Sequence, residues 1–125
     1  MSESRCKIKK VFFRSGFIDI EDDKSKCEVI SFEGGKIPQD VIETLEKENY
    51  ETLKTEYGDP SWGEPIQYDL LIVDGETERK KIEVFNRAIL LIFQNTEETR
   101  RLHRILYAIE KYKKQKGDVP YGQSP

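Results

Sequence analysis

The chain has 125 residues, of which 36% are apolar and 36% are charged, and its formal net charge is −3. This length suits one domain that buries a core without a disulfide or a metal ion. The sequence holds neither the roughly 20 apolar residues of a membrane span nor the apolar stretch of a signal peptide. We therefore expect a cytoplasmic protein with a single domain over residues 1–116, followed by a flexible tail over residues 117–125.

The N-terminal third predicts two strands joined by an acidic loop. Residues 7–14 and 27–32 are strand-like, and the loop carries Asp19, Glu21, Asp22 and Asp23. These acids lack the Asp-x-Asp-x-Asp-Gly spacing of a calcium loop, so they predict a solvated turn.

Gly34 and Gly35 then interrupt the chain, and Pro38 is placed to begin a helix that runs to about Leu53. Its apolar residues recur at helical spacing and form a stripe of Val41, Ile42, Leu45 and Leu53. We expect this stripe to face a sheet.

The segment 68–85 predicts a β-hairpin, because Asp74 and Gly75 form a turn signal between two apolar-rich runs. A two-residue loop would bring charged residues into the core. A three-residue loop instead packs Tyr68, Leu70 and Ile72 against Ile82 and Val84, and places Asp69 opposite Lys81 on the wet face. We expect the second register.

Residues 88–93 form a short apolar run whose β-branched content favours a further strand, although the start of a helix remains open. Asn95 and Glu98 predict a capping box for a last helix. Its apolar stripe consists of Leu102, Ile105, Leu106, Ile109 and Tyr112. The order of elements predicts an α+β fold, in which an antiparallel sheet of four to five strands carries two helices on one face.

The segment Arg14-Ser15-Gly16-Phe17 resembles the start of emfourin-like proteins, a family of small inhibitors of thermolysin-type metallopeptidases and uncharacterised relatives. Ile37-Pro38 at the head of a helix, the run 67–75 and a closing helix are also similar to that family. The resemblance spans most of residues 8–110, and it implies a non-enzymatic protein-binding module.

The residues themselves indicate no catalytic group, metal site or cofactor. His103 is the only histidine, and it lies among arginines on the last helix, where an exposed histidine is expected. One histidine and two separated cysteines give no zinc spacing, and residues 34–36 do not form a phosphate-binding loop.

Two functions remain from different classes. The first is a protein-binding module, either an emfourin-type proteinase inhibitor or an immunity or antitoxin-like neutraliser, with Arg14, Phe17 and Trp62 as anchors. Trp62 fits a cap over the sheet equally well. The alternative is a nucleic-acid or ribonucleoprotein accessory protein whose last helix binds through Arg100, Arg101 and Arg104, although a pI of 5.3 argues against it. The sequence identifies neither the partner nor the oligomeric state.

Overall fold

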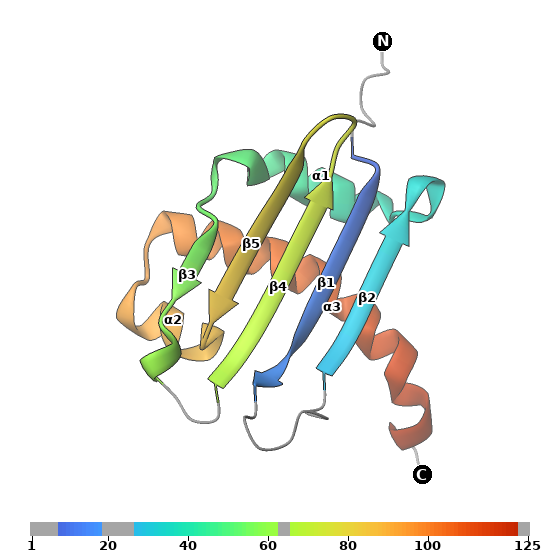
Figure 1. Ribbon diagram of the computed structural model, residues 1–125. Coiled ribbons are helices and arrows are strands. Elements are labelled where there is room, and N and C mark those ends of the chain that lie inside the picture. Colours follow the sequence, from blue (N-terminus) through green and yellow to red (C-terminus); the bar gives the residue numbers. More distant parts are fainter. Residues whose placement is uncertain (1–7, 19–26, 63–65, 123–125) are drawn as a thin grey trace.

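The computed structural model describes residues 8–18, 27–62 and 66–122, with the backbone alone at residues 18, 27 and 113–122. Its elements follow the order β1 (Lys10–Ile18), β2 (Cys27–Glu33), η2 (Gly34–Lys36), α1 (Gln39–Lys47), η3 (Tyr50–Thr52), β3 (Glu56–Gly58), η4 (Pro60–Trp62), β4 (Ile66–Asp74), β5 (Arg79–Phe85), α2 (Arg87–Phe93) and α3 (Glu97–Gly122), where η marks a 3-10 helix. Figure 1 shows the strands in one layer and the helices α1 and α3 in a second layer behind it. The predicted α+β class is confirmed.

The described strands form a five-stranded sheet in the order β2-β1-β4-β5-β3. β1 pairs antiparallel with β2 and β4, and β4 pairs antiparallel with β5. The outer strand β3 runs parallel to β5, so the sheet is mixed and not antiparallel throughout as predicted. β3 has only 3 residues, which is too short for a hydrophobic period to reveal it in the sequence.

Alternate residues of the strands face the helices and form the core. The buried apolar residues of the strands are Val11, Phe13, Ile30, Tyr57, Leu71, Val73, Ile82 and Val84. The helices cover them with the predicted apolar stripes, which include Val41, Ile42 and Leu45 on α1 and Leu102, Ile105, Leu106 and Ile109 on α3. Burial of each such side chain contributes about 1.5–3 kcal/mol, and this contact holds α1 and α3 on the same side of the sheet.

The β4–β5 hairpin does not have the predicted register. Asp74 pairs with Arg79, so the connecting loop consists of residues 75–78. Asp69 lies opposite Val84 and is fully buried, whereas we expected it on the wet face. The shift exchanges the faces of β4, so that Asp69, Leu71 and Val73 point into the core and Tyr68, Leu70 and Ile72 point away from it. The predicted register was chosen to keep charged residues out of the core. Asp69 nevertheless lies in the core, where Ser15 and Arg87 bind its carboxylate.

The apolar run 88–93 belongs to α2 and is not a strand. Asn86 has a φ of 53°, in the left-handed region, and turns the chain out of the sheet after β5. The Asn86 side chain holds this turn, because its Nδ2 donates to the Asp59 carbonyl at 2.7 Å and its Oδ1 accepts from the Gln67 N–H at 3.1 Å. The apolar run by itself fits a strand or a helix, and these tertiary hydrogen bonds favour the helix.

The predicted first helix ends early. α1 stops at Lys47, and Asn49 then has a φ of 54° and leads into η3. Leu53 therefore lies beyond the helix, although it is buried as the stripe predicted.

The N-terminal cap of α3 lies one residue later than predicted, at Thr96 and not at Asn95. The Thr99 N–H donates to Thr96 Oγ1 at 3.2 Å, and the Thr96 N–H donates to Thr99 Oγ1 at 3.0 Å. Thr96 and Thr99 thus form the reciprocal cap that we assigned to Asn95 and Glu98. At its other end α3 continues to Gly122, where we predicted a tail from residue 117. In the described part of the chain, no helix is both long and apolar enough to cross a membrane.

Candidate functional site

None of the described helices covers the sheet face opposite α1 and α3, which is turned towards the viewer in Figure 1. The strand registers place its residues in rows that cross β2, β1, β4 and β5. The rows are Cys27–Gly16–Tyr68–Phe85, Val29–Arg14–Leu70–Glu83, Ser31–Phe12–Ile72–Lys81 and Glu33–Lys10–Asp74–Arg79. We call this surface the open face.

The middle of the open face is apolar and partly exposed. Val29 is 50% exposed and lies beside Arg14 across the β1–β2 pair. Phe12, Leu70 and Ile72 are half-buried, because they shield one another across the strands without a covering layer among the described residues. The open face is therefore a candidate contact surface.

One end of the open face is aromatic. The rings of Tyr68 and Phe85 lie 5.2 Å apart between centroids. The Tyr68 hydroxyl donates to Glu83 Oε2 at 2.7 Å. Burial, followed by this contact with Glu83, raises the pKa of Tyr68 to about 12. The hydroxyl is therefore protonated at neutral pH and remains a hydrogen-bond donor.

The opposite end, at the β4–β5 turn, is charged. Arg79 donates from Nε and Nη2 to the Asp74 carboxylate at 2.6 and 3.1 Å. This hydrogen-bonded pair lowers the pKa of Asp74. Lys10 and Lys81 lie nearby on the same face. An apolar centre with a charged rim is the usual anatomy of a protein interface.

The three predicted anchor residues do not form one surface. Arg14 is exposed on the open face. Phe17 is 50% exposed at the end of β1, in register with Gln67 and on the helix side of the strand. Trp62 packs against the core with its ring edge-on to Phe93, at 5.0 Å between centroids. Only Arg14 belongs to the open face, and Trp62 serves as a cap.

The predicted basic residues of α3 largely serve the fold. Arg101 donates from Nε and Nη2 to the Glu48 carbonyl at 3.0 and 2.5 Å. Arg104 donates to the Glu48 carboxylate at 2.8 and 3.0 Å, and the pKa of that carboxyl is lowered, first by this hydrogen bond. Arg100 bonds Glu97 at 3.2 Å and remains exposed. Two of the three arginines therefore attach α3 to the end of α1.

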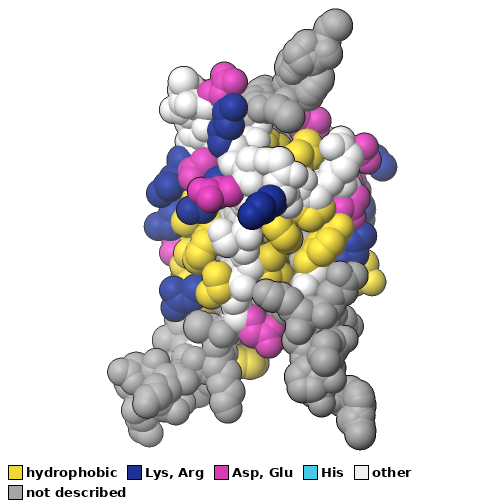
Figure 2. All heavy atoms as spheres, turned by 90° about the vertical axis from the view of Figure 1, so that its right-hand side faces the viewer, with side chains coloured by type: hydrophobic (Ala, Val, Ile, Leu, Met, Phe, Trp, Pro, Cys, Tyr) yellow, Lys and Arg dark blue, Asp and Glu magenta, His cyan; other side chains and the backbone are white. Residues whose placement is uncertain are grey.

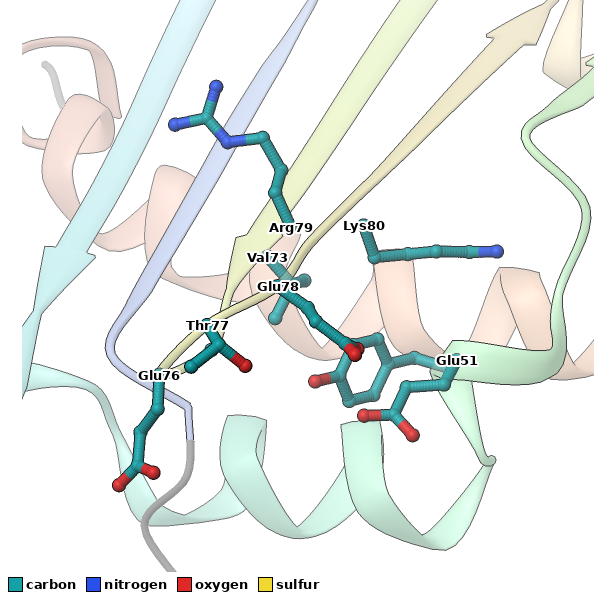
Figure 3. Close-up of a pocket in the computed structure, with 9 residues that line it drawn as sticks. Glu51, Val73, Glu76, Thr77, Glu78, Arg79 and Lys80 are labelled. Atoms are coloured by element: carbon teal, nitrogen blue, oxygen red, sulfur yellow. The ribbon is translucent and has the colours of Figure 1, made fainter.

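A hollow of about 300 Å³ lies between the β4–β5 turn and η3 (Figure 3). Its lining includes three carboxylates, those of Glu51, Glu76 and Glu78. In Figure 3 the Glu51 and Glu78 side chains point toward each other, whereas Lys80 extends away and donates to the Leu53 carbonyl. The hollow is acidic, and nothing in its described lining identifies a ligand, so we assign it no function.

A second hollow, about 310 Å³ in volume, lies between α2 and α3 and is lined by Leu91, Arg100, His103, Arg104 and Tyr107. Tyr107 is 68% exposed at its rim. His103 is half-buried, not exposed as we expected, and burial followed by the charge of Arg87 lowers its pKa. His103 is therefore mostly neutral at neutral pH.

Sequence reasoning missed a buried ionic network beneath α3. Asp69 Oδ1 accepts from the Ser15 hydroxyl at 2.6 Å, and Asp69 Oδ2 accepts from Arg87 Nη1 at 3.0 Å. Arg87 also donates to both Glu110 oxygens at 2.9 and 2.7 Å. Burial raises the pKa of Asp69 and is only partly opposed by Ser15 and Arg87. Burial also opposes the charge of Arg87, but the bonds to Glu110 and Asp69 outweigh it and raise the pKa of Arg87.

The network joins β1, β4, α2 and α3, and it holds its charges in mutual hydrogen bonds. The periods of a strand or a helix, about 2 and about 3.6 residues, cannot show such a pairing. The bonded residues are separated by 18, 23 and 54 positions in the chain. The signal that could have found it is Asp69 itself, the one charged residue inside the apolar run from Tyr68 to Val73.

In the described residues, no group of three or more His, Cys, Asp or Glu side chains is arranged to hold a metal ion. The acidic group Asp19, Glu21, Asp22 and Asp23 lies outside the described residues. Comparisons with protein-family models, curated proteins and solved structures find no match. The resemblance to emfourin-like proteins therefore stays a prediction.

Proposed function

We propose that this chain is a small, non-enzymatic protein-binding module of the cytoplasm that contacts its partner through the open face. The observation that supports this most directly is the exposure of Val29, at 50%, beside the half-buried Phe12, Leu70 and Ile72 on a sheet face without a described cover. A protein surface placed there removes this apolar area from water and gains about 25 cal/mol for each Å².

The sheet gives this surface a fixed shape. Arg14 lies between Val29 on β2 and Leu70 on β4, in the middle of the apolar rows, and is exposed. Arginine at the centre of an apolar patch is a frequent hot spot of binding energy. The charged residues at the β4–β5 turn then orient the partner, because complementary charge at a rim improves capture and register.

Binding of this kind acts by occlusion. A proteinase inhibitor of emfourin type, or an immunity or antitoxin-like neutraliser, would use the open face to cover a functional surface of its partner. The first probe is therefore a thermolysin-type metallopeptidase, whose peptide hydrolysis is measured with increasing amounts of the purified chain.

The decisive comparison uses two exposed arginines from opposite layers of the molecule. Arg14→Ala removes the centre of the open face, and Arg100→Ala is the matched control on α3. We expect Arg14→Ala to weaken binding of the captured partner or inhibited peptidase by tenfold or more, on the order of a hot-spot loss. Arg100→Ala should leave it unchanged. Equal binding by Arg14→Ala and wild type would reject the open face.

The nucleic-acid alternative rests on one arrangement, the exposed Tyr107 ring in the same hollow as Arg100 and Arg104. Aromatic rings next to arginines can stack on bases while the cations meet phosphate. This function predicts the opposite outcome of the same comparison, in which salt-sensitive binding to RNA or DNA is lost in Arg100→Ala and retained in Arg14→Ala. Arg101 and Arg104 are unsuitable for this test, because their substitution also releases α3 from Glu48.

A further inference from the structure

Among the described residues, the outer side of β2 has little of the usual protection of an edge strand. Its sequence from Cys27 to Glu33 contains no lysine, arginine or proline. The pairing with β1 is continuous from Gly16–Cys27 to Lys10–Glu33 and contains no bulge. The other edge of the sheet is formed by β3, which has only 3 residues. Natural sheets protect edges by short strands, charged side chains (above all lysine), proline, bulges or a covering segment. β3 is protected by its shortness, whereas β2 carries only the carboxylates of Glu28 and Glu33.

The hydrogen bonds of β2 show which of its backbone groups point outward. The Gly34 N–H donates to the Lys9 carbonyl at 3.0 Å, immediately beyond the Lys10–Glu33 pair. Hydrogen-bonded pairs alternate along an antiparallel ladder. The backbone groups of residues 28, 30 and 32 therefore bind β1, and those of Val29, Ser31 and Glu33 face away from the sheet.

We propose that two copies of this chain associate through β2, antiparallel and with Ile30 of one copy opposite Ile30 of the other. This register is the one in which all of Cys27–Glu33 overlaps. It brings Val29 opposite Ser31 of the other copy and Cys27 opposite Glu33. These are the residues whose N–H and C=O groups face outward, so each pair can exchange two hydrogen bonds.

The charges of β2 fit a second copy in this register. Glu28 lies opposite Phe32 of the other copy, and Glu33 lies opposite Cys27, so no two glutamates face each other. Like charges directly opposite each other would destabilise such a pair. The two sheets join into one continuous sheet with both open faces on the same side.

Apolar side chains flank the joint. Figure 2 looks onto the β2 edge, and hydrophobic side chains gather in the middle of this view. On the open face, the Val29 side chains of the two copies are diagonal neighbours, which lie about 7–8 Å apart in a sheet. On the helix side, Phe32 packs edge-on against Tyr112 at 5.6 Å between centroids. The side chains of Val29 and Phe32 both become more buried when a second β2 is added.

The test measures mass in solution by light scattering after gel filtration, from micromolar to millimolar protein. We expect wild type to form a dimer that dissociates on dilution. Ser31→Pro removes an outward N–H without removing a bond to β1, and Val29→Lys places two like charges across the joint. Each should weaken association on the order of tenfold to a hundredfold, because both copies lose the contact. Ile92→Lys is the matched control, since Ile92 is 75% exposed on α2, away from β2.

A wild-type monomer at millimolar concentration would overturn the proposal. So would a dimer that survives in Val29→Lys with a native circular dichroism spectrum. This second variant keeps the test valid if Ser31→Pro does not fold. Arg14→Ala should remain dimeric, because Arg14 lies on β1 and not at the joint. Loss of the dimer and loss of partner binding at the open face are therefore measured with different variants.

The register has its own test. In a chain with Cys6 and Cys27 replaced by serine, the double variant Val29→Cys, Ser31→Cys should form a covalent dimer on mild oxidation. Either single variant should not, because its cysteine faces Ser31 or Val29 of the other copy. A single Ser31→Cys variant that cross-links as well as the double variant would refute the register.

Discussion

Replacement of Arg87 by methionine tests the buried network most directly. Asp69 is 1% exposed and Arg87 12% exposed at their side chains, so both charges are removed from water. Arg87→Met keeps the length of the apolar stem but leaves Asp69 without a cation. Loss of one partner from a buried ion pair costs about 3–5 kcal/mol. Glu110 is 20% exposed and can turn to solvent, so we expect the lower end, about 3 kcal/mol at neutral pH.

The loss should depend on pH, with a sign that follows from Asp69. Burial raises the pKa of this carboxyl above its unfolded value of about 3.9, and Arg87 and Ser15 oppose the rise. A carboxyl with a raised pKa contributes stability that is present below its unfolded pKa and is lost as the pH rises through the folded pKa. Arg87→Met removes an opposing charge and raises that folded pKa further. The difference between variant and wild type should therefore shrink as the pH falls from about 7 towards about 4, because Asp69 becomes protonated.

The measurement is equilibrium unfolding in urea, followed by circular dichroism at each pH for both proteins. The matched control is Arg79→Met, which breaks the solvent-exposed pair with Asp74 on the open face. We expect a much smaller loss for this control. A loss for Arg87→Met that is as small as for Arg79→Met, or that does not change between the two pH values, would refute our account of the network.

Two further substitutions test local features of the fold by the same unfolding measurement. Gly58→Ala should destabilise the chain by on the order of 2 kcal/mol or more, because Gly58 has a φ of +83° and an added Cβ would lie 1.9 Å from the Phe85 carbonyl oxygen; stability equal to wild type would show that β3 is free to move away from β5. Thr96→Ala should cost about 1 kcal/mol through loss of the α3 cap, whereas Asn95→Ala should cost less; the reverse order would restore Asn95 as the cap.

The class of fold and most of the core could be predicted from residue patterns. The apolar stripes of α1 and α3 repeat at helical spacing, and every core residue predicted for these stripes except Tyr112 is buried. Such patterns are local, since a helix or strand that buries one face must repeat an apolar residue at its own period. Arg14 was predicted as an anchor because arginines often dominate interface energetics, and the alternation of β1 places it on the side opposite Phe13, where it is exposed.

The pairing of strands and the partners of charged residues were decided by tertiary contacts. The Asp74–Gly75 turn signal located the hairpin but not its register, because Asp69 enters the core only when Ser15 and Arg87 come from other elements to bind it. Burial of an unpaired carboxylate costs too much free energy. The sequence does not reveal that Arg87, 18 positions away, pairs with Asp69 and offsets this cost.

The sequence by itself determined that this chain forms an α+β domain, with a stripe on each long helix for one face of a sheet. Only the tertiary structure decided that residues 88–93 form a helix, that Trp62 and Arg101 serve the fold, and that Phe12, Val29 and Leu70 meet on the open face. The physical reason is that the period of a strand fixes which of its residues share a side, whereas the layer that covers that side comes from elsewhere in the chain.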